Sequence, residues 1–327
     1  LPAQWSVQRK DRALAGLLDQ MMALAGIRRP VLWFYTPMMW PIARHVDAAA
    51  VVYDCMDELS AFRFAPPGLA ANEAALMKAA DVVFTGGQSI FEAKAGRHGN
   101  IHVFPSAVDT SHFANARAAL AEPADQAALP GPRLGFYGVI DERLDLGLIA
   151  ALAKARPQWS IVMIGPLAKI GPEDLPRAPN IHWLGQRGYD QLPAYLSGWD
   201  VALMPFAMNE ATRFISPTKT PEYLAGGVQV VSTPVPDVVR QYGDLGAVRI
   251  APDAARFIQA SEEILAGQGL AWREAADRML ADQSWDNTFR QMQSHLDRVM
   301  RRRLLSPSPL PGVEGLLAPD GVTSMPA

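Results

Sequence analysis

Short apolar runs alternate with amphipathic segments along most of this chain of 327 residues. The run Val31-Leu32-Trp33-Phe34-Tyr35 is continuous and apolar, as in a strand buried on both faces of a parallel sheet. Similar runs lie at residues 51–53, 81–84 and 101–104. The periodicity is helical before the first run, at residues 7–26, and between later runs, at residues 69–80 and 88–97. Strands that alternate with helices at this spacing predict βαβ units and a parallel sheet.

A second series of the same kind begins after residue 132. It predicts strands near residues 133–137, 160–164, 181–184, 200–204, 228–231 and 247–250. Helix-like segments separate them near residues 144–155, 190–197, 218–225 and 253–266. We therefore expect an α/β fold with two Rossmann-like, doubly wound parallel-sheet domains that face each other across a cleft.

Changes in composition suggest the boundaries of five segments. We expect an N-terminal domain over 1–115, a linker over 116–132 that ends in Leu-Pro-Gly-Pro, and a second domain over 133–284. A helix over 285–304 is expected to pack back on the first domain, and the Pro-, Gly- and Ser-rich residues 305–327 to form a disordered tail. No Gly-rich strand end precedes residue 31, so we expect the start of the first domain to be missing.

Bulk composition narrows the classes of function. A net charge of −3 does not favour nucleic-acid binding, which usually needs a basic surface. The single cysteine, Cys55, excludes an internal disulfide, and the six histidines show no ligand spacing, so we expect no metal site. No apolar run reaches the roughly 18 residues of a membrane span.

The segment with the clearest candidate chemistry follows the strand near 200–204. Ser216 is a suitable N-cap, and Pro217 suits the first position of a helix. Lys219 would lie in the first turn, where free N–H groups and a positive charge favour phosphate, and Glu222 would share its face. The local pattern alone favours an ordinary capped helix carrying a surface Lys219–Glu222 pair.

A resemblance to a known family makes this segment more specific. The runs 199–205, 216–219, 221–227 and 230–233 resemble the donor domain of GT-B glycosyltransferases, and most of all the family-4-like enzymes and glucuronosyltransferases that build bacterial surface polysaccharides. The similarity extends from about residue 31 to residue 300. It implies transfer of a hexosyl or uronosyl group from a nucleotide sugar, with a UDP-sugar favoured, to a glycan or lipid-linked acceptor, without a cofactor or metal.

The same resemblance assigns roles to individual residues. Glu222 would hold the ribose, while Ser216, Thr218 and Lys219 would line the phosphates. In the loop after the strand at 133–137, Gly138 would let the backbone approach the diphosphate and Arg143 would balance its charge. One departure concerns Phe214, eight positions before Glu222, where many family-4 enzymes carry a second glutamate. The stereochemistry of transfer is therefore left open.

Sugar transfer needs a general base for the acceptor hydroxyl. An acidic cluster, Asp54-Cys55-Met56-Asp57-Glu58, follows the strand at 51–53, where a base could face the cleft. Asp57 matches similar enzymes best, with Asp54 and Glu58 as alternatives. These carboxylates could equally cap the next helix or lie in solvent.

Two further questions concern location and competing functions. Basic residues flank the first and last helices, so we expect a cytoplasmic protein with peripheral contact to the inner membrane, although solvated helix faces explain them equally well. The competing functions are a nucleotide-sugar 2-epimerase and a non-catalytic, nucleotide-binding partner subunit.

Overall fold

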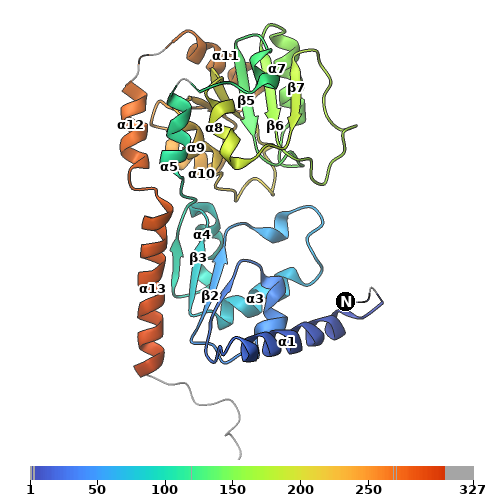
Figure 1. The fold of residues 1–327 in the computed structure, drawn as a ribbon, viewed down its shortest axis with the longest axis vertical. Coiled ribbons are helices and arrows are strands. Elements are labelled where there is room, and N and C mark those ends of the chain that lie inside the picture. The colour runs from blue at the N-terminus through green and yellow to red at the C-terminus, as the bar shows by residue number, and fades with distance from the viewer. Residues whose placement is uncertain (1, 3, 119, 268, 270, 306–327) are drawn as a thin grey trace, which may run out of the picture.

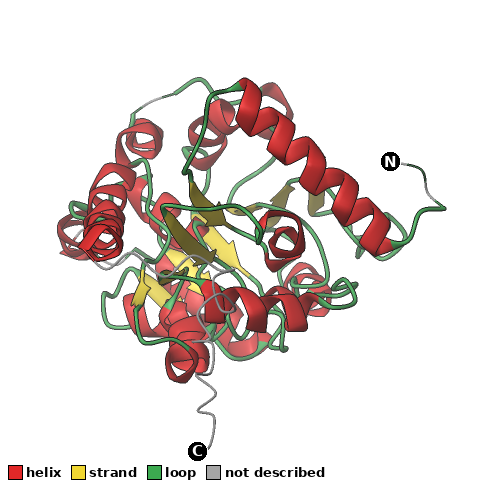
Figure 2. Ribbon diagram, turned by 90° about the horizontal axis from the view of Figure 1, so that it is seen from below, coloured by secondary structure: helices red, strands yellow, loops and turns green. Residues whose placement is uncertain are grey.

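The computed structural model describes residues 2, 4–118, 120–267, 269 and 271–305. Its strands form two parallel sheets, one in each half of the chain (Figure 1). Helices surround the strands when the molecule is viewed from below (Figure 2). The predicted fold class, two Rossmann-like parallel-sheet units, is confirmed. Of the tail expected to be disordered over 305–327, Leu305 is the last residue of a helix, and residues 306–327 lie outside the described residues.

The first sheet has four strands in the order β1-β2-β3-β4. They are β1 (Val31–Phe34), β2 (Ala50–Cys55), β3 (Val82–Thr85) and β4 (Ile101–Val103). Every residue of β2 and β3 is buried, which explains why both strands are apolar except for Asp54 and Thr85 near their carboxyl ends. The helices of this half are α1 (Val7–Leu24), α2 (Trp40–Ala43), α3 (Leu69–Ala79) and α4 (Gln88–Lys94), while α5 (Thr110–Ala114) packs against helices of the second half.

The second sheet has six strands in the order β10-β9-β8-β5-β6-β7. They are β5 (Arg133–Tyr137), β6 (Ser160–Ile164), β7 (Ile181–Gly185), β8 (Val201–Met204), β9 (Val230–Ser232) and β10 (Val248–Ile250). Its helices are α6 (Ala124–Ala127), α7 (Leu146–Ala155), α8 (Leu192–Leu196), α9 (Lys219–Ala225), α10 (Pro236–Tyr242), α11 (Ala254–Leu265) and α12 (Ala271–Leu280).

The order of the second sheet reverses at its centre. Strand β5 pairs with β6 on one side and with β8 on the other. The loops that leave β5 and β8 therefore diverge and leave a crevice at the carboxyl ends of the strands, where open α/β sheets bind ligands. This topology selects the loops after Tyr137 and Met204 as the place to look for a site.

The last helix returns the chain to the first sheet. Helix α13 (Trp285–Leu305) runs alongside β2 and β3 (Figure 1). Its Met292 and Val299 are buried with Phe84 of β3, and Arg303 Nε donates to Asp81 Oδ1 at 2.9 Å. This packing matters for function because the first turns of α13 come to lie beside the carboxyl end of the first sheet.

Several helices differ from the sequence-based expectation. Helices α10 and α12 were not predicted: α10 has seven residues and buries the polar Asp237, and α12 has ten residues and buries only Ala276 and Leu280. The expected N-cap at Ser216 is wrong. The cap of α9 is Thr218, whose carbonyl accepts from the Glu222 N–H, and the helix begins at Lys219.

Candidate active site

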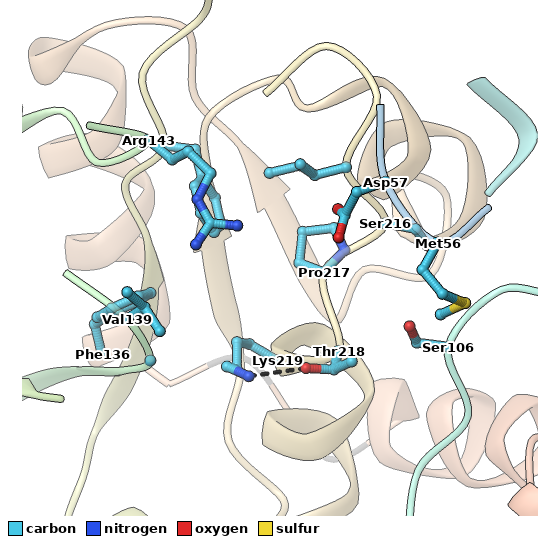
Figure 3. Close-up of a pocket in the computed structure, with 13 residues that line it drawn as sticks. Met56, Asp57, Ser106, Phe136, Val139, Arg143, Ser216, Pro217, Thr218 and Lys219 are labelled. Carbon is cyan, nitrogen blue, oxygen red and sulfur yellow. Dashed lines mark hydrogen bonds between the residues drawn. The ribbon is translucent and has the colours of Figure 1, made fainter. Parts of the chain in front are cut away.

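A cavity of about 260 Å³ lies between the two sheets, at the carboxyl ends of their strands. Figure 3 shows the side chains that line it. The first sheet contributes the loops after β2 and β4, and the second sheet contributes the loops after β5 and β8 and the start of α9. The structure brings six of the sequence-predicted site residues to this cavity: Asp57, Gly138, Arg143, Ser216, Thr218 and Lys219. The seventh, Glu222, is buried and does not line it.

Gly138 ends β5 in a backbone conformation that favours glycine, with φ of 149°. A Cβ atom at this position would lie 3.1 Å from the Phe136 ring and 3.2 Å from Lys219 Cε. The residue against it, Gly165, has the same φ, and a Cβ there would collide with the Gly138 carbonyl oxygen. Both glycines therefore keep the floor of the cavity open and the Lys219 side chain in place.

Arg143 contributes a fixed positive charge to the cavity. Its Nε lies 3.0 Å from both carboxylate oxygens of Asp141, and its Nη2 lies 2.8 Å from Asp141 Oδ2. Burial lowers the pKa of the guanidinium, but the hydrogen bonds to Asp141 outweigh this effect and raise it. The bidentate contact orients the guanidinium plane, as anion recognition by arginine requires.

Lys219 is the second cation of the cavity. It is the first residue of α9, and its Nζ donates to Thr218 Oγ1 at 2.8 Å (Figure 3). No carboxylate of the described residues forms a salt bridge with Lys219. A phosphate in the cavity would therefore meet this charge without displacing an existing ion pair.

The three candidate bases have different environments. Glu58 Oε2 lies 2.6 Å from the buried Lys94 Nζ, so it already has a cationic partner. Asp54 is buried and faces a different cavity. Asp57 lines the cavity that holds Arg143 and Lys219, and burial raises the pKa of its carboxyl while the charge of Arg143 opposes the shift. Position in the cavity thus favours Asp57 among the three.

The loop that carries Asp57 rests on a buried ion cluster. Lys94 is fully buried, and its Nζ contacts both Glu58 Oε2 at 2.6 Å and Glu73 Oε1 at 2.7 Å. Arg97 Nη1 adds a contact of 2.8 Å to Glu73 Oε2. Burial raises the pKa of Glu73. The hydrogen bond and charge of Lys94 and the hydrogen bond from Arg97 outweigh this effect, so the pKa is lowered overall and Glu73 is ionised in the folded protein.

We expect Lys94→Met to lower the free energy of unfolding by about 3–5 kcal/mol, because it leaves two carboxylates without their buried cation. Arg97→Met serves as the control, since Arg97 is half-exposed and its loss should cost no more than about 1 kcal/mol. Urea denaturation measures both variants. Equal losses in the two would show that burial of Lys94 does not govern the stability of this loop.

Glu222 is buried next to Tyr137 and does not line the cavity. Its Oε2 is buried without a hydrogen bond of ordinary geometry among the described residues, and the Tyr137 hydroxyl lies close enough to the carboxylate to interact with it. Burial raises the pKa of Glu222, and the charge of Lys219 opposes the shift. Burial and the charge of Glu222 raise the pKa of the Tyr137 hydroxyl. A carboxylate oxygen at this place is suited to accept hydrogen bonds from a ligand.

Sequence reasoning missed part of the cavity wall. Ser106 follows the carboxyl end of β4, and Phe206 follows that of β8, which is a signal that could have identified both. Met56, Phe136, Val139, Ile215 and Pro217 complete the lining. In the described part of the chain, no group of three or more His, Cys, Asp or Glu side chains is arranged to hold a metal ion.

Comparison with known proteins identifies the type of site. Residues 131–267, which include the second sheet and α9, match the family described as "Glycosyl transferases group 1". The "Putative teichuronic acid biosynthesis glycosyltransferase TuaH" of Bacillus subtilis is 26% identical over 305 residues, which is 86% of this chain and 76% of TuaH. Residues 131–267 therefore form a domain of the group 1 glycosyltransferase type, and the chain as a whole has the GT-B fold.

Solved structures agree on this fold. Sucrose-phosphate synthase from Thermosynechococcus elongatus is similar with a TM-score of 0.67 and 18% identity, over 94% of this chain and 81% of that one. HepE of Anabaena, solved with UDP and glucose, is similar with a TM-score of 0.69 and 14% identity, over 91% of this chain and 84% of that one. The matched regions include both sheets. The structural similarity therefore extends to the arrangement of the two domains and is not limited to one of them.

Proposed function

We propose that this protein is a glycosyltransferase that transfers a hexosyl or uronosyl group from a UDP-sugar to a glycan or lipid-linked acceptor in the synthesis of a bacterial surface polysaccharide. One observation carries the proposal: candidate residues from both halves of the chain line a single cavity at the switch point of the second sheet. The name of TuaH supports the polysaccharide, and the complex of HepE with UDP and glucose supports the nucleotide.

The donor half of the cavity has the charges that a diphosphate needs. Lys219 and Arg143 bring two cations, and the Gly138 backbone leaves room for the phosphate oxygens. When the bond between the sugar C1 and the phosphate oxygen breaks, the charge that develops on UDP would be stabilised by these groups. Glu222 would accept hydrogen bonds from the ribose hydroxyls with its Oε2.

The acceptor half supplies a base. Asp57 would take the proton of the acceptor hydroxyl as its oxygen attacks C1 of the sugar. The raised pKa of this carboxyl suits the role, because a base gains strength as its pKa approaches the working pH.

The place of action would be the cytoplasmic face of the inner membrane. No helix in the described ranges is both long and apolar enough to cross a bilayer. Arg9 and Arg12 on α1, and Arg301 and Arg302 on α13, are basic groups that could contact anionic lipids while the active site meets its acceptor.

Thermal unfolding with nucleotides tests the donor assignment. UDP at about 100 times its Kd should add about 2.7 kcal/mol to the stability and raise the Tm by several degrees. GDP and TDP at the same concentration should give smaller shifts. Lys219→Ala should abolish the UDP shift, whereas Lys154→Ala, an exposed lysine on α7, should retain it. No shift with any nucleotide would contradict the proposal.

A further inference from the structure

A second and larger cavity, of about 500 Å³, lies next to the proposed donor site. Met56 belongs to the walls of both cavities. The volume is in the range of small-molecule sites, which is about 300–1,000 Å³. The remaining walls come from the first sheet and the start of α13: Trp33, Tyr35, Asp54, Phe104, Pro105, Trp285, Thr288, Phe289 and Met292.

One wall is a single face of α13. Trp285, Thr288, Phe289 and Met292 follow the i, i+3, i+4, i+7 spacing, which places them on one side of a helix. Met292 is buried against the sheet, but Trp285 and Phe289 are 50% and 57% exposed. On the opposite wall Tyr35 is 64% exposed. The mouth of the cavity is therefore lined by large aromatic groups that no described segment covers.

A buried carboxyl group lies in this apolar wall. Asp54, near the end of β2, is only 3% exposed. Its Oδ2 accepts a hydrogen bond from Trp33 Nε1 at 3.0 Å, while its Oδ1 is buried and has no partner among the described residues. Burial raises the pKa of Asp54 to about 6, and the bond from Trp33 opposes the shift. Above that pH an ionised oxygen lacks a donor, which is costly unless a ligand supplies one.

We propose that this cavity is the acceptor subsite, and that it takes a neutral molecule whose hydroxyl donates to Asp54 Oδ1 and whose apolar body packs against the aromatic walls. The inference rests on the proposed function, because only a transferase needs an acceptor beside its donor site. A phosphate or carboxylate at this place would meet the negative charge of Asp54. A free sugar would leave most of its hydroxyls without partners, because Asp54 and Thr288 are the main polar groups of the lining.

The subsite gives Asp54 and Asp57 separate tasks. Asp57 lines the donor cavity, where the sugar C1 would lie, and Asp54 lines the adjoining one. Asp54 therefore binds the part of the acceptor that does not react. Met56 lines both cavities, so the reacting hydroxyl of the acceptor must extend past Met56 to reach the sugar. The sequence could not assign this task, because Trp285 and Phe289 lie more than two hundred positions from Asp54.

Binding of simple alcohols tests the subsite without knowledge of the natural acceptor. The full chain is titrated with 1-octanol, and separately with octanoate, at about pH 8, where Asp54 is ionised. Quenching of tryptophan fluorescence reports binding, because Trp33 and Trp285 line the cavity. We expect 1-octanol to bind at least about tenfold more tightly than octanoate, the effect of one hydrogen bond to a charged group.

Two variants locate the bound alcohol. Asp54→Asn should remove the preference for 1-octanol over octanoate, because the negative charge is gone. Phe289→Ala, an exposed position whose loss cannot unfold the chain, should weaken 1-octanol binding about tenfold. Leu304→Ala, at a more exposed apolar position at the other end of α13, should leave binding unchanged. Unaltered affinity in Phe289→Ala, or equal affinity for the alcohol and the carboxylate, would overturn the proposal.

The outcome is separable from that of the proposed function. UDP should shift the Tm of all these variants as it shifts the wild type, because none of them lines the donor cavity. A normal UDP shift without 1-octanol binding would overturn the acceptor subsite alone. Binding of 1-octanol that occurs only after removal of residues 306–327 would show that this chain's own segment fills the cavity, and would also overturn it.

Discussion

Asp57→Asn is expected to lower kcat for sugar transfer by about 10²–10⁴-fold, which is the usual contribution of a positioned general base. The change keeps the shape of the side chain but removes its ability to take a proton. Asp57 enters the cavity from the first sheet, whereas the residues proposed to bind UDP come from the second sheet. The increase in Tm on addition of UDP should therefore be the same in the variant as in the wild type. Steady-state kinetics with the wild type and the variant measure the effect.

The pH dependence gives an independent check on this base. Burial raises the pKa of Asp57, with partial opposition from Arg143, so the active, ionised form is lost at a higher pH than for an ordinary aspartate. We therefore expect kcat/KM to fall as the pH decreases through this raised pKa, and the fall to be absent in Asp57→Asn. Asp47→Asn is the matched control, since Asp47 is an exposed aspartate outside the cavity, and the acid limb of this variant should not move. An unchanged acid limb in Asp57→Asn would assign the base elsewhere.

Lys219→Ala is expected to lower kcat/KM by about 10²–10³-fold, because the lysine would meet the charge that develops on the departing diphosphate. Lys219→Arg keeps the charge and should recover most of the loss. Lys154→Ala removes a lysine of the same domain outside the cavity and should have no effect. A loss in Lys219→Ala no larger than that in Lys154→Ala would show that this cation does not act on the donor.

Much of the fold could be predicted from the sequence because buried parallel strands have a distinct pattern. Runs such as Val31-Leu32-Trp33-Phe34 and Val82-Val83-Phe84 are apolar on both faces, and all ten predicted strands are present. Short helices were less visible. Helix α10 has only seven residues, too few for a periodic pattern to stand out from the loops around it.

The site was predictable where residues are close in sequence or follow a strand end. Six of the seven candidates meet in one cavity, although their roles stay predictions. The choice among Asp54, Asp57 and Glu58 was not predictable, because it depends on Lys94, which reaches Glu58 from a helix more than thirty positions away. The burial of Glu222 outside the cavity lining was also missed, since a helical period gives the face of a residue but not its depth.

A crystal structure of the chain with UDP tests the central claim most directly. The account predicts the diphosphate between Lys219 and Arg143, within hydrogen-bond distance of both, and the ribose hydroxyls on the Glu222 carboxylate. UDP bound outside this cavity, or bound in it with the ribose away from Glu222, would contradict the account.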